Sequence, residues 1–332
     1  IIQGGELFDT LQVTGLAGEN AIVKLDLFGP FATREAISCE GEPLWSGTVP
    51  VTGDGEYQSE TVNLSVGGYY TYRERIDAFG FVRRQQAPCA ETSETTIVVG
   101  EPKITTKVSR QRVRPGATVT DEVIVSGLGA LEAEVEVELW GPYPSRAAIN
   151  CVGSPAHTET FTAAGDGTYT TKTVKLNQAG YYTYRERILG QLYTQATETA
   201  CGEAAETTFV QARPRVTTVV SRQAIRPGSR IFDRVRVKGL GSTPATVELE
   251  LFGPFSTRDA IRCAANKRVW RGLVKVNGDG TTRSPSVKLS KAGFYSYRER
   301  LIGTSVVQGT TPRCAAASET SLARPLILTG RG

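Results

Sequence analysis

Three glutamates recur at one position of a repeated segment, and buried carboxyl groups of this kind could do acid–base chemistry. Glu74, Glu186 and Glu299 each follow a tyrosine-rich run, in segments 68–75, 180–187 and 293–300. Strand-like alternation places each glutamate on the same side as the apolar residues and predicts that it faces inward. Hydrolysis of a glycoside needs two carboxyl groups beside a cleft, and we expect no second recurrent carboxylate here. The pattern therefore favours a structural role over a catalytic one.

An inward carboxylate is costly unless a cation or hydrogen bonds satisfy it. Three arginines recur in phase with the glutamates. We predict structural ion pairs that close one end of each domain, namely Arg34–Glu74, Arg146–Glu186 and Arg258–Glu299.

Six cysteines offer redox or metal chemistry, and they fall two to each repeat. Six cysteines allow fifteen pairings, but units that fold alone favour one bridge in each, giving Cys39–Cys89, Cys151–Cys201 and Cys263–Cys314. A zinc site needs closely spaced ligands, whereas the chain has no C-x-x-C motif and only one histidine, His157. We predict three disulfides, no metal and a location outside the cytosol.

Other catalytic and cofactor patterns are missing from the sequence. Nucleophilic catalysis needs a nucleophile with a base beside it, but the chain has one histidine and its cysteines are expected to be paired. No glycine-rich phosphate loop links a strand to a helix. The Gly165-Asp166-Gly167 turn lacks the further acidic ligands of a calcium loop. We expect no cofactor and no enzymatic activity.

The elements that position these residues recur with a period of 112 to 113 residues. In the second copy we predict strands over 103–113, 121–128, 133–143, 157–162, 168–176, 181–188 and 192–199. Seven short strands with glycine turns between them predict an immunoglobulin-like sandwich. The fold class is therefore all-β, with three tandem immunoglobulin-like domains in an elongated array over 1–100, 101–212 and 213–332.

Composition limits the partners. The net charge of +4 comes from 38 basic and 34 acidic residues spread along the chain, so it does not indicate nucleic acid. No apolar run is long enough to cross a membrane as a helix. We expect a secreted, extracellular or cell-surface protein without membrane insertion.

Two features leave a binding role open. Paired aromatics, at Phe28 with Phe31 and at the equivalent Trp140, Tyr143, Phe252 and Phe255, could stack on a glycan, although packing at the end of the sandwich is favoured. Arg234, Arg236 and Lys238 alternate on one strand and could meet an anionic cell-wall polymer, although a solvated strand face is the default.

The chain ends are in phase with the repeat. The first copy lacks the strand that precedes the Pro-Gly turn in the other two, and residues 325–329 align with the start of such a strand. A free strand can complete another copy's open sheet, and this head-to-tail pairing generates filaments. The predicted assembly tail, 322–332, includes Leu322, Pro325, Leu326, Ile327, Leu328 and Thr329. The alternative is that the chain is part of a longer array of repeats cut at an arbitrary point, which could also end with the beginning of a further repeat.

The motifs Val108-Ser109-x-Gln111 before Pro115-Gly116, Asp121 ahead of Ser126-Gly127-Leu128, and Gly-Tyr-Tyr-Thr-Tyr-Arg-Glu followed by Cys and Glu-Thr-Thr carry a family resemblance. The chain resembles the tandem immunoglobulin-like repeats of secreted surface proteins from actinobacteria. The resemblance implies a cell-surface stalk or adhesin. We therefore predict a non-enzymatic structural protein, a stalk or a filament subunit, with an adhesin that recognises a glycan or host protein as the alternative.

Overall fold

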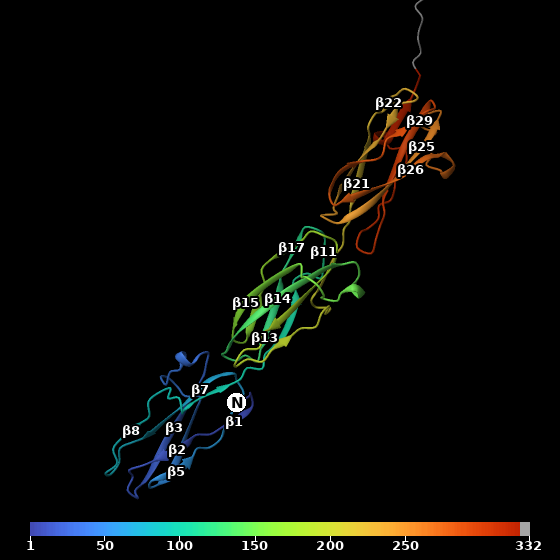
Figure 1. Ribbon diagram of the computed structural model, residues 1–332. Helices are drawn as coiled ribbons and strands as arrows, with labels where there is room; N and C mark the ends of the chain where they lie inside the picture. Colours follow the sequence, from blue (N-terminus) through green and yellow to red (C-terminus); the bar gives the residue numbers. More distant parts are fainter. Residues whose placement is uncertain (326–332) are drawn as a thin grey trace, which may run out of the picture.

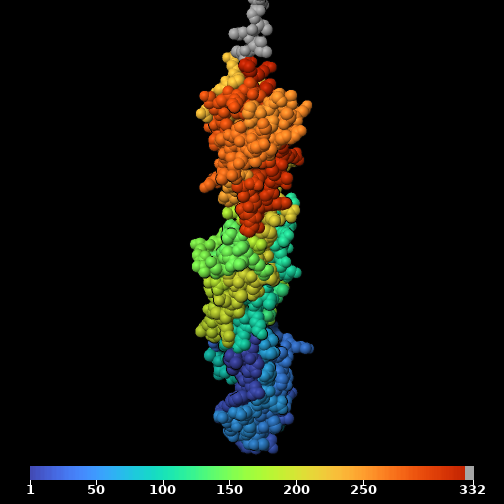
Figure 2. All heavy atoms as spheres, turned by 90° about the vertical axis from the view of Figure 1, so that its right-hand side faces the viewer, coloured from blue at the N-terminus to red at the C-terminus, as the bar shows by residue number. Residues whose placement is uncertain are grey.

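The computed structural model describes residues 1–325 and shows three β-sandwich domains in a line (Figure 1). Domain 1 contains β1 to β9, domain 2 contains β10 to β20 and domain 3 contains β21 to β30. Figure 2 shows the three domains stacked end to end as an elongated rod. Within residues 1–325, no helix has the length and apolar character needed to cross a membrane. The predicted fold class is confirmed.

Domain 2 has the full set of strands and serves as the template. Its larger sheet has the order β11-β20-β18-β14-β15, with β19 also paired to β18, and it faces a sheet of order β10-β13-β16 and the pair β12-β17. The strands are β10 (Lys103–Val108), β11 (Arg112–Val113), β12 (Ala117–Val119), β13 (Asp121–Ser126), β14 (Glu132–Tyr143), β15 (His157–Ala164), β16 (Gly167–Thr170), β17 (Val174–Leu176), β18 (Gly180–Ile188), β19 (Thr197–Glu198) and β20 (Thr207–Val210).

Domains 1 and 3 repeat this arrangement. Domain 1 has β1 (Gly5–Leu7), β2 (Thr10–Val13), β3 (Asn20–Phe31), β4 (Trp45–Thr52), β5 (Gly55–Gln58), β6 (Val62–Leu64), β7 (Gly68–Ile76), β8 (Gln85–Gln86) and β9 (Thr95–Val98). Domain 3 has β21 (Arg215–Val220), β22 (Ala224–Ile225), β23 (Arg230–Ile231), β24 (Asp233–Lys238), β25 (Pro244–Phe255), β26 (Arg268–Asn277), β27 (Gly280–Arg283), β28 (Val287–Lys288), β29 (Gly293–Leu301) and β30 (Thr320–Ala323). Short 3-10 turns are η1 (Arg34–Ala36), η2 (Arg146–Ala148), η3 (Ala265–Lys267) and η4 (Ala317–Glu319).

Alternation along the strands builds the core. In domain 2, Val123 and Val125 of β13 face Val135, Val137 and Leu139 of β14, and all five side chains are buried. The residues between them on both strands point to solvent or to the outer face of the sheet. The two sheets therefore bury one apolar face each, which is the arrangement that stabilises a sandwich.

The last strand of the larger sheet in domain 2 lies in a different segment from the predicted one. We predicted a seventh strand over 192–199, but the strand that pairs with β18 there is only β19, and the main partner is β20. Residues 191–194 instead form a hairpin tip, with a bridge between Gln191 and Thr194. Tyr193, Thr194 and Thr197 are residues common in strands, which is why the segment resembles a strand in sequence.

Domain 1 has no strand in the place of β10 and β21 among the described residues. Its β1 pairs with β6 as β12 pairs with β17, and its β2 pairs with β5 as β13 pairs with β16. In domain 2 the outer edge of β13 is covered by β10 along six residue pairs. The corresponding edge of β2 is bare.

The two junctions between domains use the same contacts. At the first, the amide of Gly100 donates to the carbonyl of Tyr193 at 2.9 Å and the amide of Gln195 donates to the carbonyl of Gly100 at 3.0 Å. At the second, Ala212 makes the same pair of bonds with Val306 and Gln308, at 3.0 and 2.9 Å. The hairpin tip of each following domain thus joins the linker that leads into it.

Candidate functional site

Each domain brings three carboxyl groups together inside the sandwich, and we call each group an acidic triad. Each member of a triad contributes one carboxylate oxygen, and these three oxygens lie within 4.8 Å of one another. The triads are Asp9, Glu74 and Glu94 in domain 1, Asp121, Glu186 and Glu206 in domain 2, and Asp233, Glu299 and Glu319 in domain 3. The expectation that no second carboxylate accompanies the recurrent glutamate is therefore wrong.

Three different strands position each triad. In domain 2, Asp121 begins β13, Glu186 lies in β18 and Glu206 directly precedes β20. A reciprocal pair of bonds holds the aspartate backbone: the amide of Asp121 donates to Oγ1 of Thr171 at 2.7 Å, and the amide of Thr171 donates to the carbonyl of Asp121 at 3.0 Å. Asp9 with Ser59 and Asp233 with Ser284 repeat this pair. The sandwich thus fixes the same geometry three times.

The triad of domain 2 is closed to solvent. Asp121, Glu186 and Glu206 each have 0% exposed surface. Thr106 of β10 and Thr199 donate their hydroxyls to Oε2 of Glu186 at 3.2 and 2.8 Å. Both oxygens of Asp121, both of Glu206 and Oε1 of Glu186 have no hydrogen-bond partner. Five carboxylate oxygens of this triad are therefore buried without a hydrogen-bond donor.

This environment raises the pKa of the triad carboxyl groups. Burial, followed by the charges of Glu186 and Glu206, raises the pKa of Asp121 to about 10. Burial, followed by repulsion from Glu206, raises the pKa of Glu186 to about 7. In domain 3, burial and the charges of the neighbouring glutamates raise the pKa of Asp233 to about 10. The ionised form of each triad is destabilised because no positive charge balances it.

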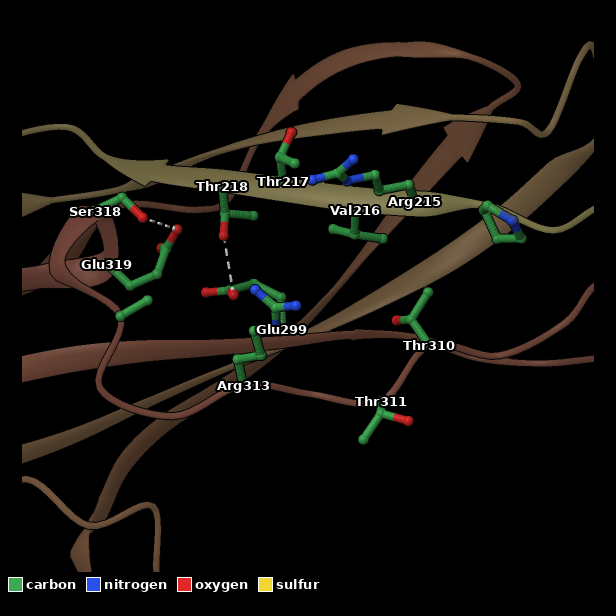
Figure 3. A pocket seen from close by; sticks show the side chains of 12 residues that line it. Arg215, Val216, Thr217, Thr218, Glu299, Thr310, Thr311, Arg313, Ser318 and Glu319 are labelled. Atoms are coloured by element: carbon green, nitrogen blue, oxygen red, sulfur yellow. Dashed lines mark hydrogen bonds between the residues drawn. The ribbon is translucent and has the colours of Figure 1, made fainter.

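The other two triads open to pockets. In domain 3, Glu299 and Glu319 line a pocket of about 350 Å³ together with Arg215 and Arg313 (Figure 3). Thr218 of β21 donates to Oε2 of Glu299 at 3.0 Å, as Thr106 does in domain 2. In domain 1, a groove of about 460 Å³ runs along β2 and exposes the triad. The groove lies where β10 and β21 cover the other two domains.

The predicted Arg–Glu ion pairs do not form. Within residues 1–325, no ion pair joins Arg34, Arg146 or Arg258 to Glu74, Glu186 or Glu299. Arg34 follows the end of β3 and donates from Nη2 to Oγ1 of Thr92 at 2.6 Å. That end of β3 pairs with Tyr69, whereas Glu74 lies five residues further along β7, or about 17 Å away. The prediction is wrong because the two recurrent residues lie toward opposite ends of the sheet.

Arginines do pair with the glutamates of the outer face. Arg187 on β18 lies 2.8 Å from Glu136 on β14, and in domain 3 Arg298 bonds Glu250 while Arg300 bonds Glu248. The residues of each pair stand directly across from one another in the strand register. The outer face of the sheet thus has a ladder of opposite charges, and its cations form no ion pair with the acidic triads.

In each domain a disulfide joins the loop after the long central strand to the segment before the last strand of the larger sheet. Cys39 is joined to Cys89, Cys151 to Cys201 and Cys263 to Cys314. Among the described residues no cysteine is free. In domains 1 and 2 the first cysteine of the bridge follows the 3-10 turn after the long central strand, whereas Cys263 precedes the turn η3.

The paired aromatics are largely buried. Phe28, Trp140 and Phe252 have at most 6% exposed surface, and Phe252 packs with Phe255 and Ile261 in a small cluster beside Cys263. A flat platform open to a sugar ring needs exposed ring faces. The structure thus favours packing at the end of the sandwich, as the sequence did.

The predicted assembly tail lies partly inside domain 3. Leu322 belongs to β30, where it pairs with Phe294 on one side and Ala224 on the other, so it is not free to leave its sheet. Pro325 follows this strand. Leu326, Ile327, Leu328 and Thr329 lie outside the described residues.

No protein-family model and no curated protein matches the chain. Solved structures match weakly. FdeC, an adhesin of Escherichia coli, is 16% identical with a TM-score of 0.36, over 98% of this chain and 94% of that chain. An α2-macroglobulin from E. coli is 12% identical with a TM-score of 0.26, over 98% of this chain and 23% of that one. A Corynebacterium diphtheriae protein described as membrane-anchored is 10% identical with a TM-score of 0.22, over 99% and 90%. Likenesses this weak carry no argument about function.

Proposed function

We propose that the chain is a non-enzymatic extracellular structural protein whose domains stack end to end. The observation that carries this proposal is the repeated junction, in which Gly100 and Ala212 make the same two backbone hydrogen bonds with the next domain. Repeated bonds of this kind fix the angle between successive domains, whereas a flexible linker would have none. Three disulfides suit an oxidising environment outside the cell.

At its end away from domain 2, domain 1 has the same hairpin tip that forms the junctions. Phe79 and Val82 make the bridge that Gln191 and Thr194 make in domain 2. Phe81 stands in the place of Tyr193, whose ring packs edge-on against Tyr69 of the preceding domain at 5.9 Å between centroids. Phe81 is 99% exposed. This end of domain 1 therefore matches a surface that elsewhere receives the end of another domain of the same kind.

We infer that a second copy of the chain supplies the missing partner, by donating its C-terminal strand to domain 1. The groove along β2 presents a bare sheet edge, and Leu326-Ile327-Leu328-Thr329 offers apolar and β-branched residues with a threonine where β10 has Thr106. Pro325 lies two residues after Ala323, whereas Pro214 lies four after the equivalent Val210, so the donated strand would enter through a shorter linker. Head-to-tail donation generates an open filament.

Sedimentation and electron microscopy test this assembly. The chain should form polymers whose length grows with protein concentration, and deletion of residues 326–332 should leave monomers. Replacement of the same seven residues by glycine and serine is the matched control for length. A peptide with the sequence of Pro102 to Ser109 should compete for the groove and shorten the polymers. If the chain stays monomeric at every concentration, the filament proposal is wrong and the chain is a stalk that does not polymerise.

One observation favours a second function, binding of an anionic polymer by domain 3. Arg234, Arg236 and Lys238 of β24 are exposed on one face, beside Arg215 of β21 and Arg283 of β27. The same face of domain 2 carries Glu122, Ile124 and Ser126. Retention on an immobilised polyanion that weakens steeply with salt, and that is lost in Arg234→Ser with Arg236→Ser, would support this function.

A further inference from the structure

The acidic triads place three carboxyl groups inside each sandwich with no cation to balance them. Ion pairs form elsewhere in domain 2, between Arg187 and Glu136, but within residues 1–325 none involves a triad member. Three buried charges of one sign are too costly to stand alone. We propose that each acidic triad binds one hard divalent cation of the calcium type.

The spacing of the oxygens fits a shared ion. Calcium is bound by oxygen ligands at about 2.3–2.6 Å, so two oxygens on one ion can lie at most about 4.6–5.2 Å apart. In each triad, one oxygen from each of the three carboxyl groups lies within 4.8 Å of the other two. A cation at their centre would therefore reach all three carboxyl groups without a change of backbone.

The number and state of the oxygens also fit. Glu186 accepts hydrogen bonds from Thr106 and Thr199 at Oε2, which suits an ionised carboxylate, and its Oε1 has no hydrogen-bond partner. Together with both oxygens of Asp121 and both of Glu206, domain 2 offers five unpartnered carboxylate oxygens. Oxygen-only ligation selects a hard cation such as calcium over zinc or copper.

A buried hydroxyl points to the same place in all three domains. Tyr184 has 1% exposed surface, and its hydroxyl has no hydrogen-bond partner. Tyr184 lies two residues before Glu186 on the inward face of β18, so its side chain lies beside the triad. Tyr72 on β7 and Tyr297 on β29 lie two residues before Glu74 and Glu299, also with unpartnered hydroxyls. These hydroxyls are further neutral oxygen ligands.

The three sites differ in their surroundings. Domain 2 is closed, domain 1 is open along the groove, and domain 3 has Arg215 and Arg313 lining its pocket together with Glu299 and Glu319 (Figure 3). Positive charge near a site weakens cation binding. We therefore expect domain 3 to bind the ion more weakly than domain 2.

Calcium titration of chelator-treated full-length protein tests the proposal. We expect three ions per chain by isothermal titration calorimetry and a rise of about 10 °C in the melting temperature of the calcium-bound domains at a hundredfold excess over Kd. Terbium bound in the same sites should luminesce when tyrosine is excited, because Tyr184 and its counterparts lie beside the triads. No thermal shift at about 10 mM calcium, ten times the weakest Kd typical of extracellular sites, would overturn the proposal.

Amide variants distinguish a triad that binds a cation from a triad whose carboxyl groups share protons. Asp121→Asn, and Glu206→Gln as a second variant in case the first fails to fold, should each lower the stoichiometry from three ions to two. Glu122→Gln removes an exposed charge next to Asp121 and should keep three. If protons balance the triads, the amide variants will instead stabilise the chelated protein at pH 8 and calcium will have no effect, which refutes the cation site.

Discussion

Glu248 on β25 and Glu299 on β29 show how the surroundings of a carboxyl group set its pKa. Leu249 faces Glu299 across β25 and β29, and Glu248 faces Arg300. Burial and the charge of Glu319 raise the pKa of Glu299 to about 8. Burial would also raise the pKa of Glu248, but hydrogen bonds from Arg271 and Arg300 lower it below its usual value. The inner face of each sandwich lacks such cations, so its carboxyl groups resist ionisation.

The chelated protein should lose stability as pH rises. Asp121 and Glu186 have raised pKa values in the folded chain and ordinary values near 4 when unfolded, so folding takes up protons between those limits. Their stabilisation is complete below about pH 4 and is lost as pH rises through about 7 to 10, at about 1.4 kcal/mol per pH unit for each proton released.

Urea unfolding with a chelator at pH 5 to 9 measures this slope. The groups facing the triad of domain 2 are the neutral hydroxyls of Thr106, Thr199 and Tyr184, so no other charge opposes the trend. Asp121→Asn should flatten the slope for domain 2, and Glu122→Gln should not. Stability that stays constant from pH 5 to 9 would contradict the assignment of raised pKa values.

Gly141 is a residue at which a single methyl group should be damaging. Its φ is +124°, and a Cβ there would lie 2.5 Å from the carbonyl oxygen of Tyr181. We expect Gly141→Ala to lower the stability of domain 2 by more than the 1–3 kcal/mol of backbone strain alone. Gly153→Ala is the matched control, because Gly153 also has positive φ but open space around it. Equal melting temperatures for the two variants would show that the close approach is relaxed.

At the scale of elements, the sequence predicts the features that depend on the alternation of apolar and polar residues along a strand. The central strands β14 and β18 and the inward face of Glu186 follow from period two, because each strand has one apolar side. β20 was missed because it has only four residues, and the hairpin tip before it mimics a strand. The acidic triad was missed because Asp121, Glu186 and Glu206 come from three strands far apart in the chain, and only the fold brings them together.

Removing one disulfide should affect one domain. Cys151 and Cys201 are separated by 50 residues, so the bridge restricts a long loop in the unfolded chain. Replacement of both by serine should cost domain 2 about 2–5 kcal/mol. Calorimetry of the whole chain should show one transition moved to lower temperature and the others unchanged. If all transitions move together, the domains unfold as one unit and the junctions carry more energy than their few bonds suggest.

At the scale of the whole molecule, the rod depends on the junctions. The Gly165-Asp166-Gly167 turn contributes to the first junction. Oδ1 of Asp166 accepts hydrogen bonds from the amides of Leu128 and Gly129 at 2.7 and 3.1 Å, and these bonds hold the turn that meets domain 1. Next to it, the amide of Ala130 donates to the carbonyl of Gly67 at 2.9 Å. Backbone bonds from two separate loops, together with the ring of Tyr193 against Tyr69, restrict both bending and twisting between the domains.

Small-angle scattering tests whether the hairpin tip keeps the rod straight. Tyr193→Ser removes the ring from the junction but leaves the domain cores intact, so the maximum dimension should fall as domain 1 swings while the melting temperatures stay the same. Leu192→Ser is the control, because Leu192 is the neighbouring residue of the same tip and is 81% exposed. If Tyr193→Ser scatters like the unaltered chain, the backbone pair at Gly100 is sufficient for a rigid joint. The exposed Phe81 would then be dispensable for the joining of copies as well, because it occupies the position of Tyr193 in domain 1.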